Sequence, residues 1–142
     1  MAQFLGNYKG AFIPGTRTFK LESYLVFKSD KFIWKDLDNG RRIAKEIERG
    51  DSIPDGWSNE WSIPRGSKTD GASIPRLARL VVGSPFGKGR RKSSAIHDVL
   101  CRAKNLRPEI VHGLFNEMVR YESMDSTSGK LMGWAVVKFG PE

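Results

Sequence analysis

The 142-residue sequence contains a single cysteine, Cys101, and lacks any long apolar run. One cysteine excludes a disulfide within the chain, and no stretch approaches the ~20 consecutive apolar residues that a membrane-spanning helix needs. Residues 1–6 have neither the basic start nor the apolar stretch of a secretory signal, so we expect synthesis and folding in a cytosol. A chain of this length buries a core without disulfides, and we expect one domain over residues 1–142.

Acidic residues are nearly missing between Gly71 and Pro108, where Asp98 is the only one, and the whole chain carries a formal net charge of +8. Such a block favours an anionic partner, which could be nucleic acid, an envelope polymer or an acidic protein face. It also fits a solvated surface that only maintains solubility. Nucleic acid is weakly indicated, because the basic run has no aromatic residues between its charges. The candidate binding residues are Arg76, Arg90, Arg91 and Lys92.

Residues 1–65 have the composition of β structure. Two aromatic and β-branched runs, 24–27 and 32–34, are separated by a short polar segment that favours a hairpin connection. The tripeptide Asp38-Asn39-Gly40 predicts a turn. Apolar residues recur at helical spacing between residues 41 and 49, which fits either a short helix or a further hairpin strand.

The remainder of the chain predicts helices. Ser93 or Ser94 can cap the first one through a hydroxyl group, and Pro108 suits the first turn of the second. Residues 131–139 favour a third helix, although their β-branched residues also fit a strand. The expected fold class is therefore α+β, with an N-terminal antiparallel β portion and two or three C-terminal helices.

Two short motifs carry the candidate chemistry. Asp70 precedes small residues on a tight loop, and His97 and Asp98 are adjacent on the predicted first helix. Carboxylate and imidazole groups bind Zn²⁺, Mn²⁺ or Mg²⁺, so the candidate metal ligands are Asp70, His97, Asp98 and His112. A bound metal ion would activate water for hydrolysis.

Catalysis without a metal is a second interpretation of the same motifs. The candidate catalytic residues are Asp70, His97, Asp98 and Ser73, with Ser73 as a nucleophile only if a histidine pairs with it. The competing interpretation is structural, with Asp98 paired to Arg76 or Arg102 and the Asp-Gly sequence serving as a turn.

Cys101 and His112 also have alternative interpretations. Cys101 follows His97 by one helical turn and shares its face, but the spacing favours a small core residue over a Cys–His catalytic pair. His112 lies between Val111 and Gly113, which fits a packed or surface histidine as well as a ligand.

The sequence Thr69-Asp70-Gly71-Ala72-Ser73-Ile74-Pro75-Arg76, followed by Ala95-Ile96-His97-Asp98, resembles a family found largely in tailed-phage and prophage genomes. This is domain-of-unknown-function family 1353, and the resemblance covers roughly residues 55–140. Arg107 and Phe115 match the helix that follows, whereas Val111-His112 stand where the family usually carries Ala-Asp. Residues 41–55 look like an insertion relative to a short family member.

The resemblance implies a phage-encoded protein in which Asp70, Ser73, Arg76, His97 and Asp98 form one site. Two functions are then expected. The first is a small hydrolase that acts on a host envelope polymer with a divalent metal or an Asp–His pair. The second is a non-catalytic virion component, associated with the head or tail, whose basic face docks other phage structural proteins or packaged DNA. Either would be made in the host cytoplasm, and the second would travel in the virion.

Overall fold

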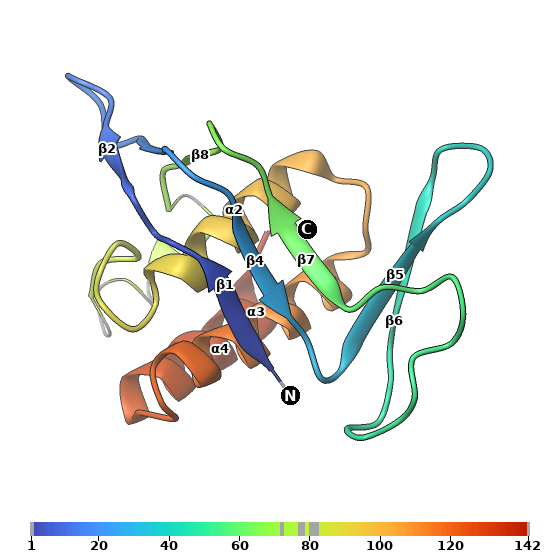
Figure 1. The fold of residues 1–142 in the computed structure, drawn as a ribbon. Helices are drawn as coiled ribbons and strands as arrows, with labels where there is room; N and C mark the ends of the chain where they lie inside the picture. The colour runs from blue at the N-terminus through green and yellow to red at the C-terminus, as the bar shows by residue number, and fades with distance from the viewer. Residues whose placement is uncertain (1, 72, 77–78, 80–82, 142) are drawn as a thin grey trace.

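The computed structural model describes residues 2–71, 73–76, 79 and 83–141. Within these ranges an N-terminal β portion precedes three helices, α2 (Arg91–Ala103), α3 (Pro108–Glu122) and α4 (Thr127–Phe139), as Figure 1 shows. This is the α+β order that the sequence predicts, including a helix for the last element. Among the described residues no helix is both long enough and apolar enough to cross a membrane.

The central sheet contains β1 (Gln3–Gly6), β4 (Leu25–Lys28) and β7 (Glu60–Ile63), with β4 between the other two. Alternate residues of β4 and β7 are buried, as expected for strands with one face on the core. The antiparallel register places Phe27 opposite Trp61. Both side chains are at most 1% exposed and pack with helical residues in one core cluster.

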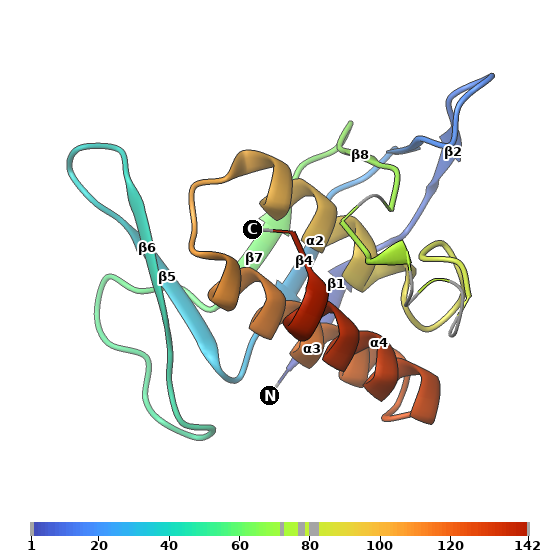
Figure 2. The ribbon, with the colours of Figure 1, turned by 180° about the vertical axis from the view of Figure 1, so that it is seen from behind.

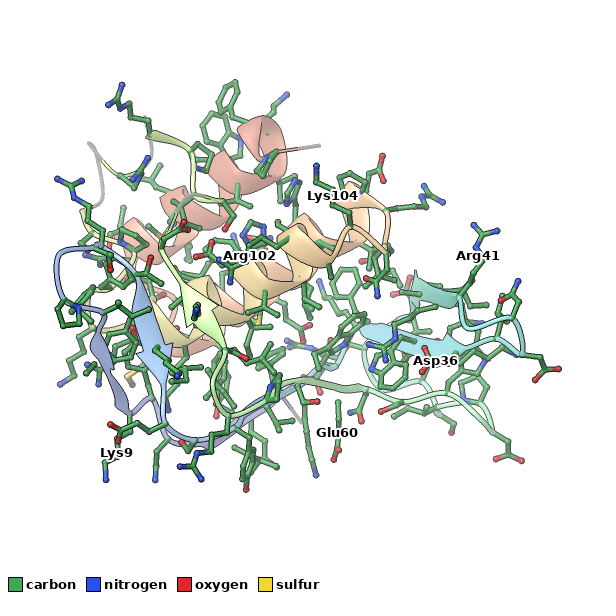
Figure 3. The ribbon with its side chains drawn as sticks, turned by 90° about the horizontal axis from the view of Figure 1, so that it is seen from above. Lys9, Asp36, Arg41, Glu60, Arg102 and Lys104 are labelled. Carbon is green, nitrogen blue, oxygen red and sulfur yellow. The ribbon has the colours of Figure 1, made fainter. Side chains whose placement is uncertain are left out.

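Two smaller antiparallel sheets flank the central one. One orders β2 (Gly10–Phe12), β3 (Phe19–Leu21) and β8 (Lys68–Thr69), and the other pairs β5 (Phe32–Asp36) with β6 (Arg42–Glu46). The β5–β6 hairpin extends away from the rest of the fold in both ribbon views (Figures 1 and 2). Figure 3 shows Asp36 and Arg41 on this arm, far from Arg102 and Lys104 of the α2 end.

The segment of residues 41–49 is therefore a hairpin strand over most of its length and not a helix. The predicted Asp38-Asn39-Gly40 turn is confirmed, with Gly40 at a φ of +82° and its N–H donating to the Leu37 carbonyl. The two strands it joins pair directly, with Trp34 opposite Ala44.

The expected hairpin between residues 24–27 and 32–34 is wrong. β4 pairs with β1 and β7, whereas β5 pairs with β6. The turn between them is held by α3, where the Glu117 carboxylate accepts hydrogen bonds from the Ser29 hydroxyl and, at 2.8 Å, from the Asp30 N–H. The Ser29 hydroxyl oxygen accepts the N–H of Phe32 at 2.8 Å. These bonds direct β5 away from β4.

The serine cap expected for the first helix is also wrong, because α2 begins at Arg91 and both Ser93 and Ser94 are buried within it. The Glu122 carboxylate, at the end of α3, accepts the N–H groups of Lys92 at 3.0 Å and Ser93 at 2.9 Å. A negative charge there satisfies free N–H groups and complements the helix dipole. Helix α3 thus fixes the start of α2, which carries His97 and Asp98.

Candidate functional site

The Asp98 carboxylate organises the loop that follows β8. Only 2% of Asp98 is exposed, and its Oδ2 accepts the Thr69 hydroxyl at 2.5 Å and the N–H groups of Asp70 at 3.0 Å and Gly71 at 2.6 Å. Its Oδ1 accepts the Ser73 N–H at 3.2 Å and the Ser73 hydroxyl. Five donors from the described residues converge on two oxygens, which is the surrounding of an ionised carboxylate.

Gly71 allows the loop to approach this carboxylate. It has a φ of +74°, a left-handed conformation that favours glycine, and a Cβ added there would lie 2.3 Å from the Cγ of Pro85. Gly71 therefore serves backbone geometry around Asp98. Asp98 pairs with neither Arg76 nor Arg102, the partners expected for a structural role; Arg102 instead donates to the Lys68 carbonyl.

A chain of polar side chains leads from Asp98 to the third helix. The Ser73 oxygen lies 2.8 Å from Nδ1 of His97, and Nε2 of His97 lies 2.9 Å from Nδ1 of His112. Nε2 of His112 lies 2.7 Å from the carbonyl oxygen of Pro141, after α4. His97 is fully buried and His112 is 5% exposed. The adjacent residues His97 and Asp98 thus point in different directions, as their helical spacing requires.

Gly140 makes the last of these contacts possible. A Cβ at this position would lie 2.7 Å from Nε2 of His112, where a side chain would meet the imidazole. The Gly140 N–H donates to the Val136 carbonyl at 2.8 Å and ends α4. The backbone that follows can therefore pass directly over the His112 ring.

The hydrogen-bond partners determine which ring nitrogens carry hydrogen. Burial, and then the neighbouring His112, lowers the pKa of His97 to about 3, so this imidazole is neutral at pH 7. Since Ser73 donates its hydrogen to Asp98, Nδ1 of His97 must donate to Ser73, which leaves a lone pair on Nε2. Nε2 of His112 must likewise donate to the Pro141 carbonyl.

The two inner nitrogens, Nε2 of His97 and Nδ1 of His112, therefore face each other as acceptors at 2.9 Å. Two lone pairs at this distance repel unless a positively charged partner, either a proton or a metal ion, is shared between them. The outer hydrogen bonds thus turn both inner nitrogens toward each other.

Cys101 completes the cluster. Its Sγ lies 3.5 Å from Nε2 of His97, and one ligand atom each from His97, Cys101 and His112 lie within 4.8 Å of one another, so that the three could hold a metal ion. Burial, and then the charge of Asp98, raises the pKa of the Cys101 thiol to about 11. The thiol is therefore protonated at neutral pH when no metal is bound.

The cluster borders a cavity of about 260 Å³. Cys101 and His112 line it together with Lys104, Leu106, Pro108 and Pro141. Cys101 is half-buried and packs against the edge of the core cluster, as its spacing favours, while its sulfur also borders this cavity. A ligand in this cavity would lie beside the sulfur and the second imidazole.

The structure places the predicted site residues in different parts of the molecule. His97 and His112 meet, as a shared metal site requires, while Ser73 and Asp98 lie behind His97 as its hydrogen-bonded support. Asp70 lines a separate cavity with Arg76. The predicted basic binding residues do not share that cavity apart from Arg76. Arg90 donates to the Ser84 carbonyl at 2.5 Å, whereas Arg91 and Lys92 lie over the rings of Tyr8 and Phe4 and line another cavity together.

Cys101 is the site residue that the sequence-based assignment leaves out. Its signal is the spacing of four residues from His97, which places two potential ligands on one helix face. The contribution of His112 depends on how α2 and α3 pack, and neither helix reveals this by itself.

Comparison with known proteins places residues 51–137 in a family model described as "Protein of unknown function (DUF1353)". Two curated relatives come from Sinorhizobium fredii (strain NBRC 101917 / NGR234). "Uncharacterized protein y4jT" is 32% identical over 106 residues, which cover 75% of this chain and 32% of the relative. "Uncharacterized protein y4iH" is 35% identical over 81 residues, which cover 57% of this chain and 34% of the relative.

The chain thus spans about a third of the length of these curated relatives. No solved structure matches it. The family match covers β7, β8 and the helices up to Val137, and so includes His97, Cys101 and His112. The chain belongs to the DUF1353 family of proteins of unknown function.

Proposed function

We propose that this protein is a zinc-dependent hydrolase whose metal ion is bound by His97, Cys101 and His112. The observation that carries the proposal is the convergence of their ligand atoms at the edge of a cavity. Three protein ligands with a fourth position left for water or substrate are typical of catalytic zinc, whereas structural zinc usually has four protein ligands.

Two of the three separations between ligand atoms are close to those around a tetrahedral ion. With Zn–N bonds of about 2.0–2.1 Å and Zn–S bonds of about 2.3 Å, tetrahedral ligands lie about 3.3 Å apart for N and N and about 3.6 Å apart for N and S. The corresponding separations are 2.9 Å between the two imidazoles and 3.5 Å between Cys101 and His97. A shift of about half an ångström between the rings would bring the two imidazole nitrogens to the tetrahedral spacing.

The donor set favours zinc over the other expected ions. Mg²⁺ and Mn²⁺ prefer oxygen ligands, whereas imidazole and thiolate suit Zn²⁺. Asp70 and Asp98 are outside the proposed ligand set because Asp98 accepts from the loop and Asp70 lines another cavity. The residues that hold the ion thus differ from the carboxylate-rich set that the motifs suggest.

Both histidines have the outer hydrogen bonds that zinc ligands usually have. Nδ1 of His97 donates to Ser73, which donates to Asp98, and Nε2 of His112 donates to the Pro141 carbonyl. Such bonds fix the tautomer and orient each ring toward the ion. In this proposal Asp98 and Ser73 are positioning residues.

The cavity supplies the remaining requirements for hydrolysis. Zinc bound by three protein ligands lowers the pKa of a water molecule toward neutrality. Hydrolysis adds the hydroxyl of this water to the electrophilic atom and its hydrogen to the leaving group. Lys104 lines the same cavity, where its ammonium group could stabilise negative charge on the substrate. The substrate class we propose is a polymer of the bacterial envelope, which is a substrate that a phage-encoded hydrolase would meet.

Release of soluble fragments from dye-labelled bacterial cell walls tests the proposal. We expect release by zinc-loaded protein, loss of release with a chelator, and recovery when zinc is restored. Cys101→Ser and His112→Ala should lose release, whereas Met124→Ala, at a residue 89% exposed, should retain it. Equal release by His112→Ala and the Met124 control would refute the zinc-dependent reaction.

A non-catalytic role in the virion is the second candidate, and one observation favours it. Leu131, Trp134 and Val137 follow one another along the outer face of α4 and are 45%, 54% and 51% exposed. Spacings of three residues place them on one side of the helix, where apolar side chains are typical of an assembly surface. Detection of the protein in purified particles, with Trp134→Glu failing to incorporate, would support this role instead.

A further inference from the structure

The cavity that Asp70 lines is separate from the cavity beside the histidine–cysteine cluster. It has a volume of about 530 Å³ and lies between the β2–β3 connection, the residues that follow the Asp70 loop, and the segment around Pro85. This volume is within the usual range for a small-molecule site. Its lining residues include Phe12, Arg17, Asp70, Arg76, Arg79 and Phe86.

Positive charge predominates in this cavity. Arg17, Arg76 and Arg79 contribute three guanidinium groups, against the single carboxylate of Asp70. None of the ion pairs recorded between described residues involves these three arginines. An anion would therefore be attracted, and guanidinium groups suit phosphate because they donate paired hydrogen bonds.

Arg79 provides the more specific evidence. Its Nε is buried and has no hydrogen-bond partner among the described atoms. A buried N–H without an acceptor is costly and rare in native structures, so an acceptor from a ligand would relieve that cost. Arg90, in the same part of the chain, differs because its Nε donates to the Ser84 carbonyl. The Nε donor of Arg90 is satisfied, whereas the Nε donor of Arg79 has no acceptor among the described atoms, and the Arg79 side chain lines the cavity.

The cavity also has an aromatic wall. Phe12 and Phe86 meet edge to face, with ring centroids 5.1 Å apart, and Phe12 is 50% exposed. Aromatic side chains bind nucleobases by stacking, without requiring a particular base. A ligand that matches both parts of the cavity carries a phosphate group at one end and a flat ring at the other.

We propose that this cavity binds a mononucleotide unit, with the phosphate on Arg76 and Arg79 and the base against Phe12. The unit is either a free nucleotide or one residue of a single-stranded nucleic acid, since both present the same phosphate and ring. The site is independent of the proposed zinc centre.

Binding of two probes tests the site: adenosine monophosphate by isothermal titration, and a fluorescein-labelled ten-nucleotide dT strand by anisotropy. Saturable binding of the monophosphate alone assigns the site to free nucleotides. Binding of the strand, with the monophosphate as competitor, assigns it to single-stranded nucleic acid. No saturable binding of either probe overturns the proposal.

Four variants locate the binding. Arg79→Ala should weaken binding by at least about tenfold, and Arg79→Lys should also weaken it although it retains the charge, because lysine lacks the Nε–H donor. Arg41→Ala, on the distant β5–β6 arm (Figure 3), removes the same charge and should change binding less than about twofold. Cys101→Ser should bind as the wild type does, so failure of the zinc centre leaves this result intact. Equal weakening by Arg79→Ala and Arg41→Ala would show a general charge effect and refute the site.

Discussion

Asp98→Asn is expected to lower the free energy of unfolding strongly, although the two side chains have nearly the same size. The carboxylate of Asp98 accepts five described donors from Thr69, Asp70, Gly71 and Ser73. An asparagine retains one oxygen, which can replace Oδ2 and keep three of these bonds. Its amide group then faces the Ser73 N–H, which is a donor and loses its acceptor.

The magnitude follows from these bonds. A buried donor left without a partner costs about 1–3 kcal/mol, and each retained bond is weaker because it no longer ends on a charge. Together these effects lower the free energy of unfolding by about 3–5 kcal/mol, a large part of the ~5–15 kcal/mol that folded proteins have. For a chain of this size the melting temperature falls by roughly 10 °C or more.

Urea unfolding followed by circular dichroism measures this change. The matched control is Asp125→Asn, which removes the same charge at an exposed position and should change the unfolding free energy by less than about 0.5 kcal/mol. A similar small change for Asp98→Asn would show that the carboxylate network does not hold the loop.

Three further predictions concern the cluster and its supporting elements. The zinc dissociation constant should fall by at least about tenfold per unit rise in pH below the Cys101 pKa of about 11, because binding displaces the thiol proton; a pH-independent constant in calorimetric titrations would contradict this. Gly71→Ala and Gly15→Ala both place alanine at nearly equal φ values, +74° and +75°, but only the first Cβ meets a neighbour. We expect a shared backbone cost of about 1–2 kcal/mol and a further 1–3 kcal/mol for Gly71→Ala alone, and equal melting temperatures would refute the close approach. Glu122→Ala should lower the unfolding free energy by about 1–2 kcal/mol through loss of the α2 cap, while exposed Glu48→Ala should leave it within about 0.5 kcal/mol; equal effects would show that the cap contributes nothing.

The elements that sequence predicts well are those with local causes. The Asp38-Asn39-Gly40 turn and the apolar stripes of α3 and α4 arise from neighbouring residues, and all three are present. The β4–β5 hairpin fails because its turn is bound by Glu117, a residue more than eighty positions later. The serine cap fails for the same reason, since Glu122 of α3 accepts the free N–H groups at the start of α2. Neither contact leaves a signal in the segment that it organises.

The candidate site follows the same division. His97, Asp98 and Ser73 could be selected from the sequence because their residue types suggest chemistry, yet their roles depend on direction. Asp98 faces the β8 loop, whereas His97 extends from Ser73 of that loop to His112 of α3, and their different directions follow from their adjacent positions on one helix. Cys101 joins His97 through helical spacing, but its function requires His112 from the packed neighbour. The sequence shows which residues could bind a metal ion, but it does not show which of them come together in the folded protein.

X-ray absorption at the zinc edge, on protein loaded with one equivalent of zinc, tests the metal centre most directly. We expect one sulfur neighbour at about 2.3 Å together with nitrogen or oxygen neighbours at about 2.0–2.1 Å. In Cys101→Ser the sulfur neighbour should be absent. Zinc without a sulfur neighbour in the wild-type protein, or failure to retain zinc in stoichiometric amount, would contradict a centre formed by His97, Cys101 and His112.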